Sequence, residues 1–283
     1  TIVYKGLLSS YQIGQFYPDL REPEFKTRMA IFHERFSTNT NPSWEMAQPF
    51  HGIAHNGEIN TIRGNRLWMN ARQRQLQSKF WKQDFQKLRP IITPGLSDSA
   101  SFDEVFSLLV QTGRDPNHAM MMMVPDPYSG FPQMDRALID FYMYHENFME
   151  PWDGPAALIF TDGETVGAKL DRNGLRPLRY TRTKSGLVIM ASEAGVVDVD
   201  DDDLIVHHHM SSGEIYSVSL TGGVENNVQT KDRISHQAKY GQLMKKNFLR
   251  LKREDNDTEF GDFAIPEGGF DKRNRLALGW HQE

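Results

Sequence analysis

A dense group of polar side chains lies between residues 33 and 65, among short apolar runs that have strand character. Arg35 carries a planar guanidinium that can hold a carboxylate through two parallel hydrogen bonds, and Thr38 adds a hydroxyl close by. Asn56 and Gly57 offer a side-chain amide and a backbone N–H that no Cβ screens, and such donors can stabilise an oxyanion. Together with a positioned acid, these groups would suit an amino-acid amide as substrate.

Each of these residues also has a structural interpretation. Asn56 and Gly57 lie in the stretch AHNGEIN, and Asn-Gly between apolar runs is a strong signal for a type I′ hairpin turn. Arg35 alone would form a surface ion pair, and Asp98 alone would cap a helix or stabilise a turn. The hairpin and oxyanion interpretations are compatible, because a tight turn would fix both donors in place.

Composition narrows the class of protein. Of the 283 residues 39% are hydrophobic, and the net charge of −5 provides no basic excess for nucleic acid. The longest apolar runs are far shorter than the roughly 18 residues needed to cross a bilayer. The chain contains no Cys, which excludes disulfides, cysteinate metal sites and a cysteine nucleophile within these residues. We therefore expect no nucleic-acid and no membrane partner.

Hydrophobic periodicity predicts the elements that must position the polar residues. It indicates helices over 65–88 and 134–149, a helix from 101 to 113 that begins with a Ser101–Glu104 capping box, and a basic helix over 239–253. Alternation and turn signals predict strands over 2–8, 28–33, 51–55, 156–161, 165–170, 178–182, 187–191 and 214–220. Two strand groups around a helical block favour an α+β fold of two packed antiparallel sheets with helices outside.

Three further clusters favour structural roles. The histidine run 207–209 would alternate between the two faces of a strand, and no acidic spacing beside it matches a metal-ligand set. The acidic run 198–203 lacks the Gly and terminal Glu of a calcium loop and indicates a solvated turn. We interpret DRNGLRP at 171–177 as a tight turn, with a contact from Asn173 or Arg176 to the site as an open alternative. No metal site is predicted.

Several motifs together resemble a known family. HERFSTNTNPSWEMAQPF and AHNGEINTIRGNRLW, followed by SDSASFDE and DRNGLRP, closely resemble the glutaminase domain of the glutamate synthase large subunit. TIVYKGLL and QFYPDL near the start and SEAGVVD further on extend the resemblance over most of the chain. Arg35, Asn56 and Asp98 also occur in the order that the family uses. The sequence is thus similar to class II, N-terminal-nucleophile glutamine amidotransferases.

The resemblance implies a fold and a domain organisation. The fold would be a four-layer αββα sandwich of the N-terminal-nucleophile hydrolase type, with two antiparallel sheets, outer helices and the N-terminal strands missing. Residues 1–265 would form the class II amidotransferase domain, and 266–283 would begin a linker into the central domain of the synthase. TIVYKG lies well inside the domain in glutamate synthases, so we interpret the chain as an internal fragment.

The resemblance also implies roles for individual residues. Arg35 would bind the α-carboxylate of L-glutamine, with Thr38 adding a hydrogen bond. Asp98 would bind the α-ammonium group, while Asn56 and Gly57 would form the oxyanion hole. The attacking group in such enzymes is the thiol of an N-terminal cysteine, whose own α-amino group acts as base. This sequence has no such cysteine, so we expect the chain alone to be inactive.

Alternatives, cofactors and partners complete the expectation. There are two alternatives. In the first, Thr1 is an N-terminal nucleophile. In the second, the chain is a catalytically silent glutamine-binding or interdomain scaffold module. The implied parent enzyme combines the released ammonia with 2-oxoglutarate on a region that contains FMN and an iron–sulfur cluster. We expect no cofactor in this segment, since cluster ligation requires thiolates. Implied partners are L-glutamine, downstream synthase domains of the same polypeptide, and a small subunit or ferredoxin, in the cytoplasm or plastid stroma.

Overall fold

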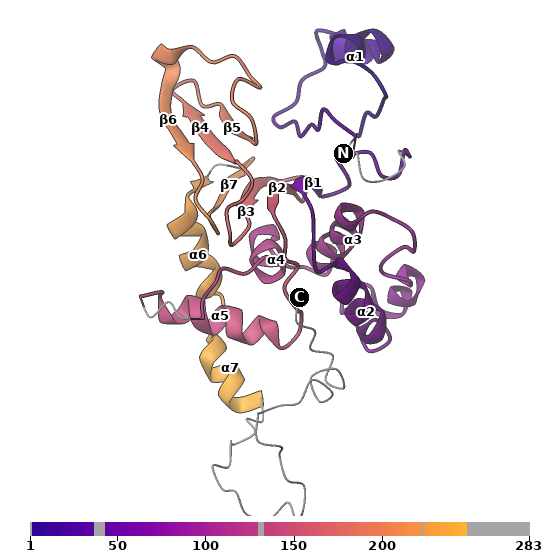
Figure 1. Ribbon diagram of the computed structural model, residues 1–283, viewed down its shortest axis with the longest axis vertical. Helices are drawn as coiled ribbons and strands as arrows, with labels where there is room; N and C mark the ends of the chain where they lie inside the picture. The colour runs from indigo at the N-terminus through magenta and orange to yellow at the C-terminus, as the bar shows by residue number, and fades with distance from the viewer. Residues whose placement is uncertain (1, 37–42, 130–132, 222, 248–283) are drawn as a thin grey trace, which may run out of the picture. The chain divides into compact units, whose positions relative to one another are not determined.

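Two antiparallel sheets organise the part of the chain that the computed structural model describes, residues 2–36, 43–129, 133–221 and 223–247 (Figure 1). The chain divides into the units Thr1–Lys246 and Asn247–Glu283, and the elements named below belong to the first, apart from the last residue of α7. The larger sheet has the order β1-β2-β3-β7-β8 and the smaller sheet the order β5-β4-β6. The strands are β1 (Ile53–Gly57), β2 (Ala156–Thr161), β3 (Thr165–Leu170), β4 (Arg179–Thr183), β5 (Val188–Ala191), β6 (Leu204–His209), β7 (Ile215–Ser219) and β8 (Val224–Glu225).

Helices precede, interrupt and follow the strands. The helix α4 is the most enclosed of them, because the side chains of its methionine run, residues 120–123, are almost fully buried. The α-helices are α1 (Ser10–Phe16), α2 (Ile62–Arg72), α3 (Asp98–Gln111), α4 (Pro116–Met123), α5 (Arg136–Glu146), α6 (Asn227–Ser235) and α7 (Tyr240–Asn247), with 3-10 turns at Pro18–Arg21, Lys82–Leu88 and Asp201–Asp203.

The two faces of the larger sheet are covered by different layers, because side chains alternate along each strand. In β2, Ala156, Leu158 and Phe160 join the core that the helices build. Phe160 meets Phe106 of α3 edge to face, with ring centroids 5.9 Å apart. Ala157 points the other way, into the cluster shared with the smaller sheet. One sheet therefore separates two apolar cores.

The second core joins the two sheets. Tyr180 of β4 stacks on Tyr216 of β7, with ring centroids 4.6 Å apart and planes inclined by 25°. Ala168 and Leu170 of β3 and Met210 beyond β6 are buried in the same cluster. The predicted α+β arrangement of two packed antiparallel sheets with helices outside is confirmed. The predicted boundary between 1–265 and 266–283 lies outside the described residues.

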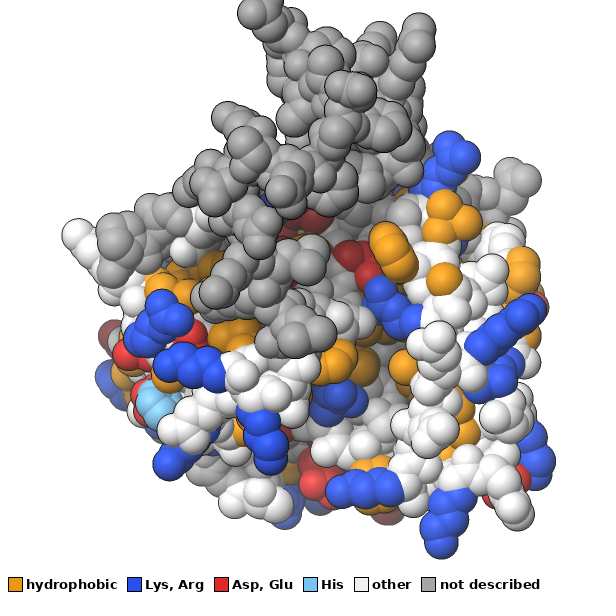
Figure 2. All heavy atoms as spheres, turned by 90° about the horizontal axis from the view of Figure 1, so that it is seen from below, with side chains coloured by type: hydrophobic (Ala, Val, Ile, Leu, Met, Phe, Trp, Pro, Cys, Tyr) orange, Lys and Arg blue, Asp and Glu red, His pale blue; other side chains and the backbone are white. Residues whose placement is uncertain are grey.

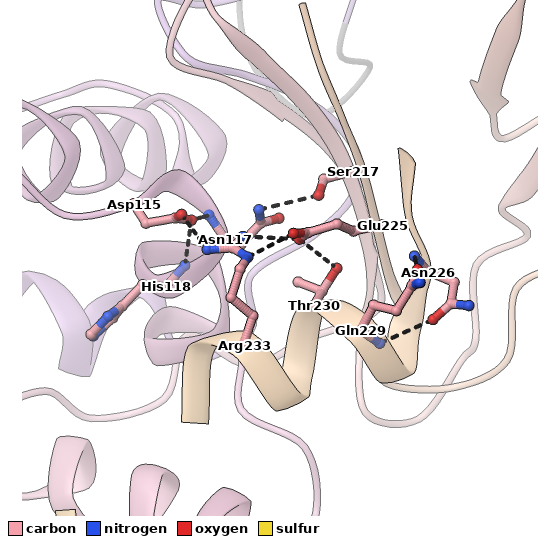
Figure 3. A network of polar contacts seen from close by, with 9 residues as sticks. All are labelled: Asp115, Asn117, His118, Ser217, Glu225, Asn226, Gln229, Thr230 and Arg233. Carbon is pink, nitrogen blue, oxygen red and sulfur yellow. Dashed lines mark hydrogen bonds and ion pairs between the residues drawn. The ribbon is translucent and has the colours of Figure 1, made fainter. Parts of the chain in front are cut away.

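A polar network fastens α4 and α6 to the β8 edge of the larger sheet (Figure 3). Arg233 of α6 holds Glu225 of β8 through two contacts, Nε–Oε1 at 2.7 Å and Nη2–Oε2 at 2.9 Å. The same guanidinium lies 2.7 Å from Asp115, which caps α4 by accepting the N–H of Asn117 at 2.8 Å. Asn117 then donates to Ser217 of β7 at 3.2 Å. The edge opposite β1 is thereby fixed by charged side chains.

Helix α3 fastens β1 at the other edge. Asp103, which is 2% exposed, accepts the backbone N–H groups of His51, Gly52 and Ile53 at 3.2, 2.8 and 2.9 Å. Burial raises the pKa of this carboxyl, while the three N–H groups act in the opposite direction. A single side chain from the helix therefore sets where β1 begins.

Two groups of predictions about elements are wrong. The residues 2–8 and 28–33 are irregular, because among the described residues no strand lies beside them to complete a backbone ladder. The single helix expected over 65–88 is instead α2, which ends at Arg72, followed by turns and a 3-10 segment. Lys82 has a φ of 47°, which a continuous right-handed helix does not allow. Packing of the apolar side chains against the core breaks the predicted helix after α2. Helical spacing in the sequence alone did not indicate this break.

The start of α3 also differs from its prediction. Ser97, and not Ser101, is the N-cap, and its hydroxyl accepts the N–H of Ala100 at 3.1 Å. Ser101 lies inside the helix, where its hydroxyl donates to the carbonyl of Ser97 at 3.0 Å. The strand over 51–55, the five strands predicted between 156 and 220 and the helix over 134–149 are confirmed within a few residues, whereas α1, α4, α6 and β8 were not predicted.

The surface of the described part carries mixed side chains. On the face seen in Figure 2, Lys and Arg side chains are interspersed with acidic and apolar ones. Large apolar side chains also reach solvent on α2, where Leu67 and Trp68 are 62% and 60% exposed. Within the described residues, no helix combines the length and apolar character that a bilayer span requires.

The contacts of Asp103 lead to a stability prediction. We expect Asp103→Ala to lower the free energy of unfolding by about 3 to 5 kcal/mol, because the buried backbone N–H groups of Gly52 and Ile53, at the start of β1, would lose their acceptor. Chemical denaturation of the two proteins would measure the loss. Glu104→Ala is the matched control on the same helix, since among the described residues Glu104 binds only the exposed Thr93, and we expect less than about 1 kcal/mol there. Equal losses would contradict the assigned role of Asp103.

Candidate active site

Within the described residues, strand β1 lies at the edge of its sheet, so half of its backbone groups have no neighbouring strand there. Glu58 donates its N–H to the carbonyl of Pro155 at 3.0 Å and so continues the ladder with β2. In an antiparallel pair, backbone N–H groups point alternately toward and away from the neighbouring strand. The N–H groups of Ile53, His55 and Gly57 therefore point away from β2 and toward the open edge. These three groups need partners from elsewhere.

Side chains satisfy the first two of the outward groups. Asp103 accepts the N–H of Ile53. The amide of Gln48 accepts the N–H of His55 at 2.6 Å and donates to its carbonyl at 3.1 Å, much as a neighbouring strand would. The N–H of Gly57 points the same way and donates to none of the described residues. One strong donor at this edge is therefore available to a ligand.

Close backbone contacts hold Gly57 in a conformation that favours glycine. Its φ is 147°, and a Cβ at this position would lie 1.8 Å from the carbonyl oxygen of Pro155. The contact is reciprocal, since a Cβ on Gly154 would lie 2.0 Å from the carbonyl oxygen of Glu58. The chain after β1 therefore lies directly against the chain before β2, and the direction of the Gly57 N–H is set by backbone packing.

The hairpin predicted at Asn56 and Gly57 is wrong. Both residues belong to β1, and their partners across the ladder are Ala157 and Ala156 of β2, far along the chain. Because Ala157 faces the smaller sheet, the half-buried Asn56 side chain lies on that face too. Its amide makes no hydrogen bond with a described residue. A strand end, and not a tight turn, brings the two proposed donors together.

Asp98 lies beside this strand end. One carboxylate oxygen accepts the N–H of Ile59 at 2.7 Å, just after β1, and the other accepts the hydroxyl of Ser99 at 3.3 Å. The Ser99 hydroxyl also lies 2.7 Å from Nδ1 of His55. The first turn of α3 thus contacts β1 and the segment that follows it, so the structure brings Asp98 close to Asn56 and Gly57.

His55 is uncharged in this setting. Burial lowers its pKa to about 4, the neighbouring Asp98 carboxylate raises it, and His33 and Arg176 lower it. Arg176 comes from the turn at 171–177, so it lies near the site, as the open alternative allowed. Asn173 instead donates its backbone N–H within that turn, to Asp171 at 2.8 Å.

The other two predicted site residues are Arg35 and Thr38. Arg35 is exposed in an irregular segment, and its guanidinium forms no ion pair with a described residue. Its backbone N–H donates to Nδ1 of His33 at 3.3 Å, and His33 is in turn near enough to His55 to influence its pKa. Thr38 lies outside the described residues. The structure therefore unites Asn56, Gly57 and Asp98 and leaves Arg35 at their periphery.

Sequence reasoning did not single out the residues that hold this arrangement. Taken one at a time in the sequence, these residues are ordinary polar side chains: His55, Gln48, Ser99 and Asp103. A buried His beside Asn-Gly and a Ser beside the acidic residue of SDSA were the available signals, but neither indicated a contact between distant segments. The link is a tertiary contact between β1 and α3.

The other polar clusters are placed by structural contacts. His207 and His208 point to opposite faces of β6, as predicted, since His207 bonds Thr181 at 2.9 Å and His208 lies 2.8 Å from Glu214. Asp200 caps the 3-10 turn at Asp201–Asp203. Across the ranges that the structure describes, no group of three or more His, Asp or Glu side chains is arranged to hold a metal ion.

The geometry agrees with a family assignment from comparison with known proteins. Residues 1–243 match the family model described as class-II glutamine amidotransferases, and the chain belongs to this family.

Curated relatives within the family are glutamate synthases. The chain is 43% identical over its whole length to the chloroplastic ferredoxin-dependent glutamate synthase 2 of Arabidopsis thaliana. It is 40% identical, over 93% of its length, to the glutamate synthase (NADPH) large chain of Bacillus subtilis (strain 168), and it spans 17% of each relative. A solved structure, the glutamine phosphoribosylpyrophosphate amidotransferase from B. subtilis complexed with ADP and GMP, aligns with a TM-score of 0.38 and 19% identity, over 69% of this chain and 34% of that one.

The packing of Gly57 leads to a second stability prediction. We expect Gly57→Ala to lower the free energy of unfolding by about 3 kcal/mol or more, because the new Cβ would collide with a backbone carbonyl at an unfavourable φ. Gly186→Ala is the matched control, with a φ of 92° and no atom within 4 Å of the added carbon, and we expect about 1 kcal/mol. Similar losses in denaturation experiments would show that the contact with Pro155 does not constrain β1.

Proposed function

We propose that this chain binds L-glutamine and forms the part of a glutamate synthase that hydrolyses the glutamine amide, releasing ammonia for transfer to 2-oxoglutarate. Membership of the class II family and 40–45% identity to glutamate synthases support this function. The observation that carries it is the outward N–H of Gly57, which has no partner among the described residues and lies beside Asn56 and near Asp98.

The proposed roles follow the chemistry of the substrate. Gly57 N–H and the Asn56 amide stabilise the oxyanion that forms when the amide carbon becomes tetrahedral. Asp98 accepts the α-ammonium group, since each of its oxygens retains hydrogen-bonding capacity beside its present partner. Arg35 binds the α-carboxylate, and its exposed guanidinium, which forms no ion pair with a described residue, supports that role. Thr38 adds a hydrogen bond to the same carboxylate.

The reaction also needs a nucleophile that these residues do not provide. A cysteine thiolate attacks the amide carbon. The C–N bond then breaks as the nitrogen gains a proton, so that ammonia is released and a glutamyl thioester remains on the cysteine. Water then cleaves the thioester to give glutamate and restores the thiol. Because the 283 residues contain no Cys, the thiol must come from another part of the polypeptide, and the chain alone is inactive.

The remaining cofactors and partners belong to the rest of the proposed enzyme. A chain without Cys cannot ligate an iron–sulfur cluster through thiolates, so we do not assign the cluster to these residues. We assign FMN, like the cluster, to the rest of the proposed enzyme. The partners are downstream synthase domains of the same polypeptide, joined through a linker from 266, with ferredoxin or a small subunit as electron source. The names of the relatives include both ferredoxin and NADPH. The compartment is the cytoplasm or the plastid stroma.

A catalytically silent glutamine-binding or scaffold module is the second candidate. The absence of Cys from the sequence favours it for the chain in isolation. A complete polypeptide with no cysteine able to reach Gly57 would support this candidate, whereas a cysteine exposed by processing would support the enzyme.

Arg35 provides the first functional test. In the complete polypeptide, Arg35→Ala should reduce kcat/KM for glutamine by the equivalent of about 2 to 4 kcal/mol, because the substrate carboxylate loses its bidentate partner. Steady-state glutaminase assays measure the change. Arg63→Ala is the control, since Arg63 is also exposed but lies on α2. If Arg35→Ala leaves the kinetics unchanged, Arg35 does not bind the carboxylate.

The isolated chain provides the second functional test. We expect it to release no ammonia from L-glutamine above background, because it has no thiol. An ammonia-release assay on the purified chain and on Thr1→Ala checks this outcome. Turnover that Thr1→Ala abolishes would instead identify Thr1 as the nucleophile.

A further inference from the structure

A buried nitrogen with no partner among the described residues lies beside the proposed oxyanion donor. His55 is 3% exposed, and its Nε2 is inaccessible to solvent and makes no hydrogen bond with a described residue. A Cβ built on Gly57 would lie 3.0 Å from this nitrogen, so the edge of the ring contacts the residue that carries the free N–H. A buried polar atom left unpaired destabilises the fold, and an apolar side chain of similar shape would avoid that loss.

The other ring nitrogen belongs to a short chain of hydrogen bonds. Ser99 has one hydroxyl hydrogen and two neighbours, the Asp98 carboxylate at 3.3 Å and Nδ1 of His55 at 2.7 Å. Because the carboxylate can only accept, the arrangement that satisfies both contacts directs this hydrogen to Asp98. The Ser99 oxygen can then only accept from His55, at 2.7 Å, so Nδ1 carries the ring proton and Nε2 has a bare lone pair. The order of donation is from His55 to Ser99 to Asp98.

This order connects the two ends of the proposed substrate site. Gly57 supplies the donor for the reacting carbonyl, and Asp98 supplies the acceptor for the α-ammonium group. His55 contacts the first through its ring edge and the second through Ser99. The link is buried, because Ser99 is only 6% exposed, so water does not compete with it.

We propose that His55 and Ser99 are positioning residues for glutamine hydrolysis, which hold the Gly57 N–H and the Asp98 carboxylate at a fixed separation. The inference rests on the proposed function, because it assigns those two groups to the same substrate. Catalysis at an oxyanion site depends on donors that are already aligned, and a small misplacement costs a large factor in rate. Loss of the link should therefore affect kcat more than KM.

The kinetic test uses the complete polypeptide with L-glutamine as substrate. We expect Ser99→Ala to lower the glutamine-dependent kcat about 10- to 100-fold, with KM changed by less than about 3-fold. Ser99→Thr keeps the hydroxyl and should restore kcat to within about 3-fold of wild type. Activity with ammonium chloride in place of glutamine should not change, because added ammonia bypasses the hydrolysis step.

His145→Asn is the matched control. His145 is 5% exposed, and its Nε2 lies 2.9 Å from Nε2 of His118, in contact with α4 and away from β1. Both variants remove a buried hydrogen bond, but only Ser99→Ala removes one from the proposed link. A fall in kcat of the same size in His145→Asn would show a general loss of stability and would overturn the inference.

A spectroscopic measurement on the chain keeps the test independent of activity. Nitrogen-15 NMR of the histidine rings distinguishes the two neutral tautomers, and we expect His55 to be protonated at Nδ1 in the wild type. Ser99→Ala should shift the ring toward the Nε2-protonated form, because the acceptor is lost. An Nε2-protonated ring in the wild type, or no shift in the variant, overturns the proposed order of donation.

The proposed function and the inference can fail separately. If Arg35→Ala and Asp98→Asn impair glutamine use but Ser99→Ala does not, the inference is wrong and the proposed function stands. If Arg35→Ala and Asp98→Asn have no effect on glutamine use, the proposed function itself is wrong.

Discussion

The hydrogen bonds from α3 to β1 determine where the functional groups of this chain lie. Asp103 holds the backbone at the start of the strand, and Asp98 holds the N–H of Ile59 just after its end. Since β1 is an edge strand, only its β2 side receives a sheet ladder, and the helix supplies much of what the open side lacks. A rigid helix thus fixes an edge that would otherwise be free to move.

The proposed chemistry at this edge depends on one backbone N–H that is unpaired among the described residues. Gln48 and Asp103 occupy the outward groups of His55 and Ile53, so the described structure offers the N–H of Gly57. The contact of Gly57 with Pro155 fixes the direction of that N–H. Alignment before the substrate arrives is what makes an oxyanion donor effective, because no reorganisation is needed during the reaction.

Both faces of the larger sheet are buried next to the β1 edge. Alternation along β2 sends Leu158 toward the helices and Ala157 toward the smaller sheet, so both faces are dry. Arg233 and its two acidic partners fix the opposite edge, so the proposed site lies at the β1 edge of the larger sheet. Asn56 and Gly57, to which the family resemblance gives roles, and the N–H that is unpaired among the described residues therefore all lie at the end of β1.

The sequence by itself determined the family, the sheet-forming runs and three of the proposed site residues that the structure unites, because residue type and local periodicity are readable without contacts. It predicted a hairpin at Asn56 and Gly57, since Asn-Gly is a local turn signal, and the distant pairing with β2 overrode that signal. Only the tertiary structure decided that the Gly57 N–H has no partner among the described residues and that His55 reaches Asp98 through Ser99. These facts depend on contacts between segments far apart in the chain, which local propensity does not encode.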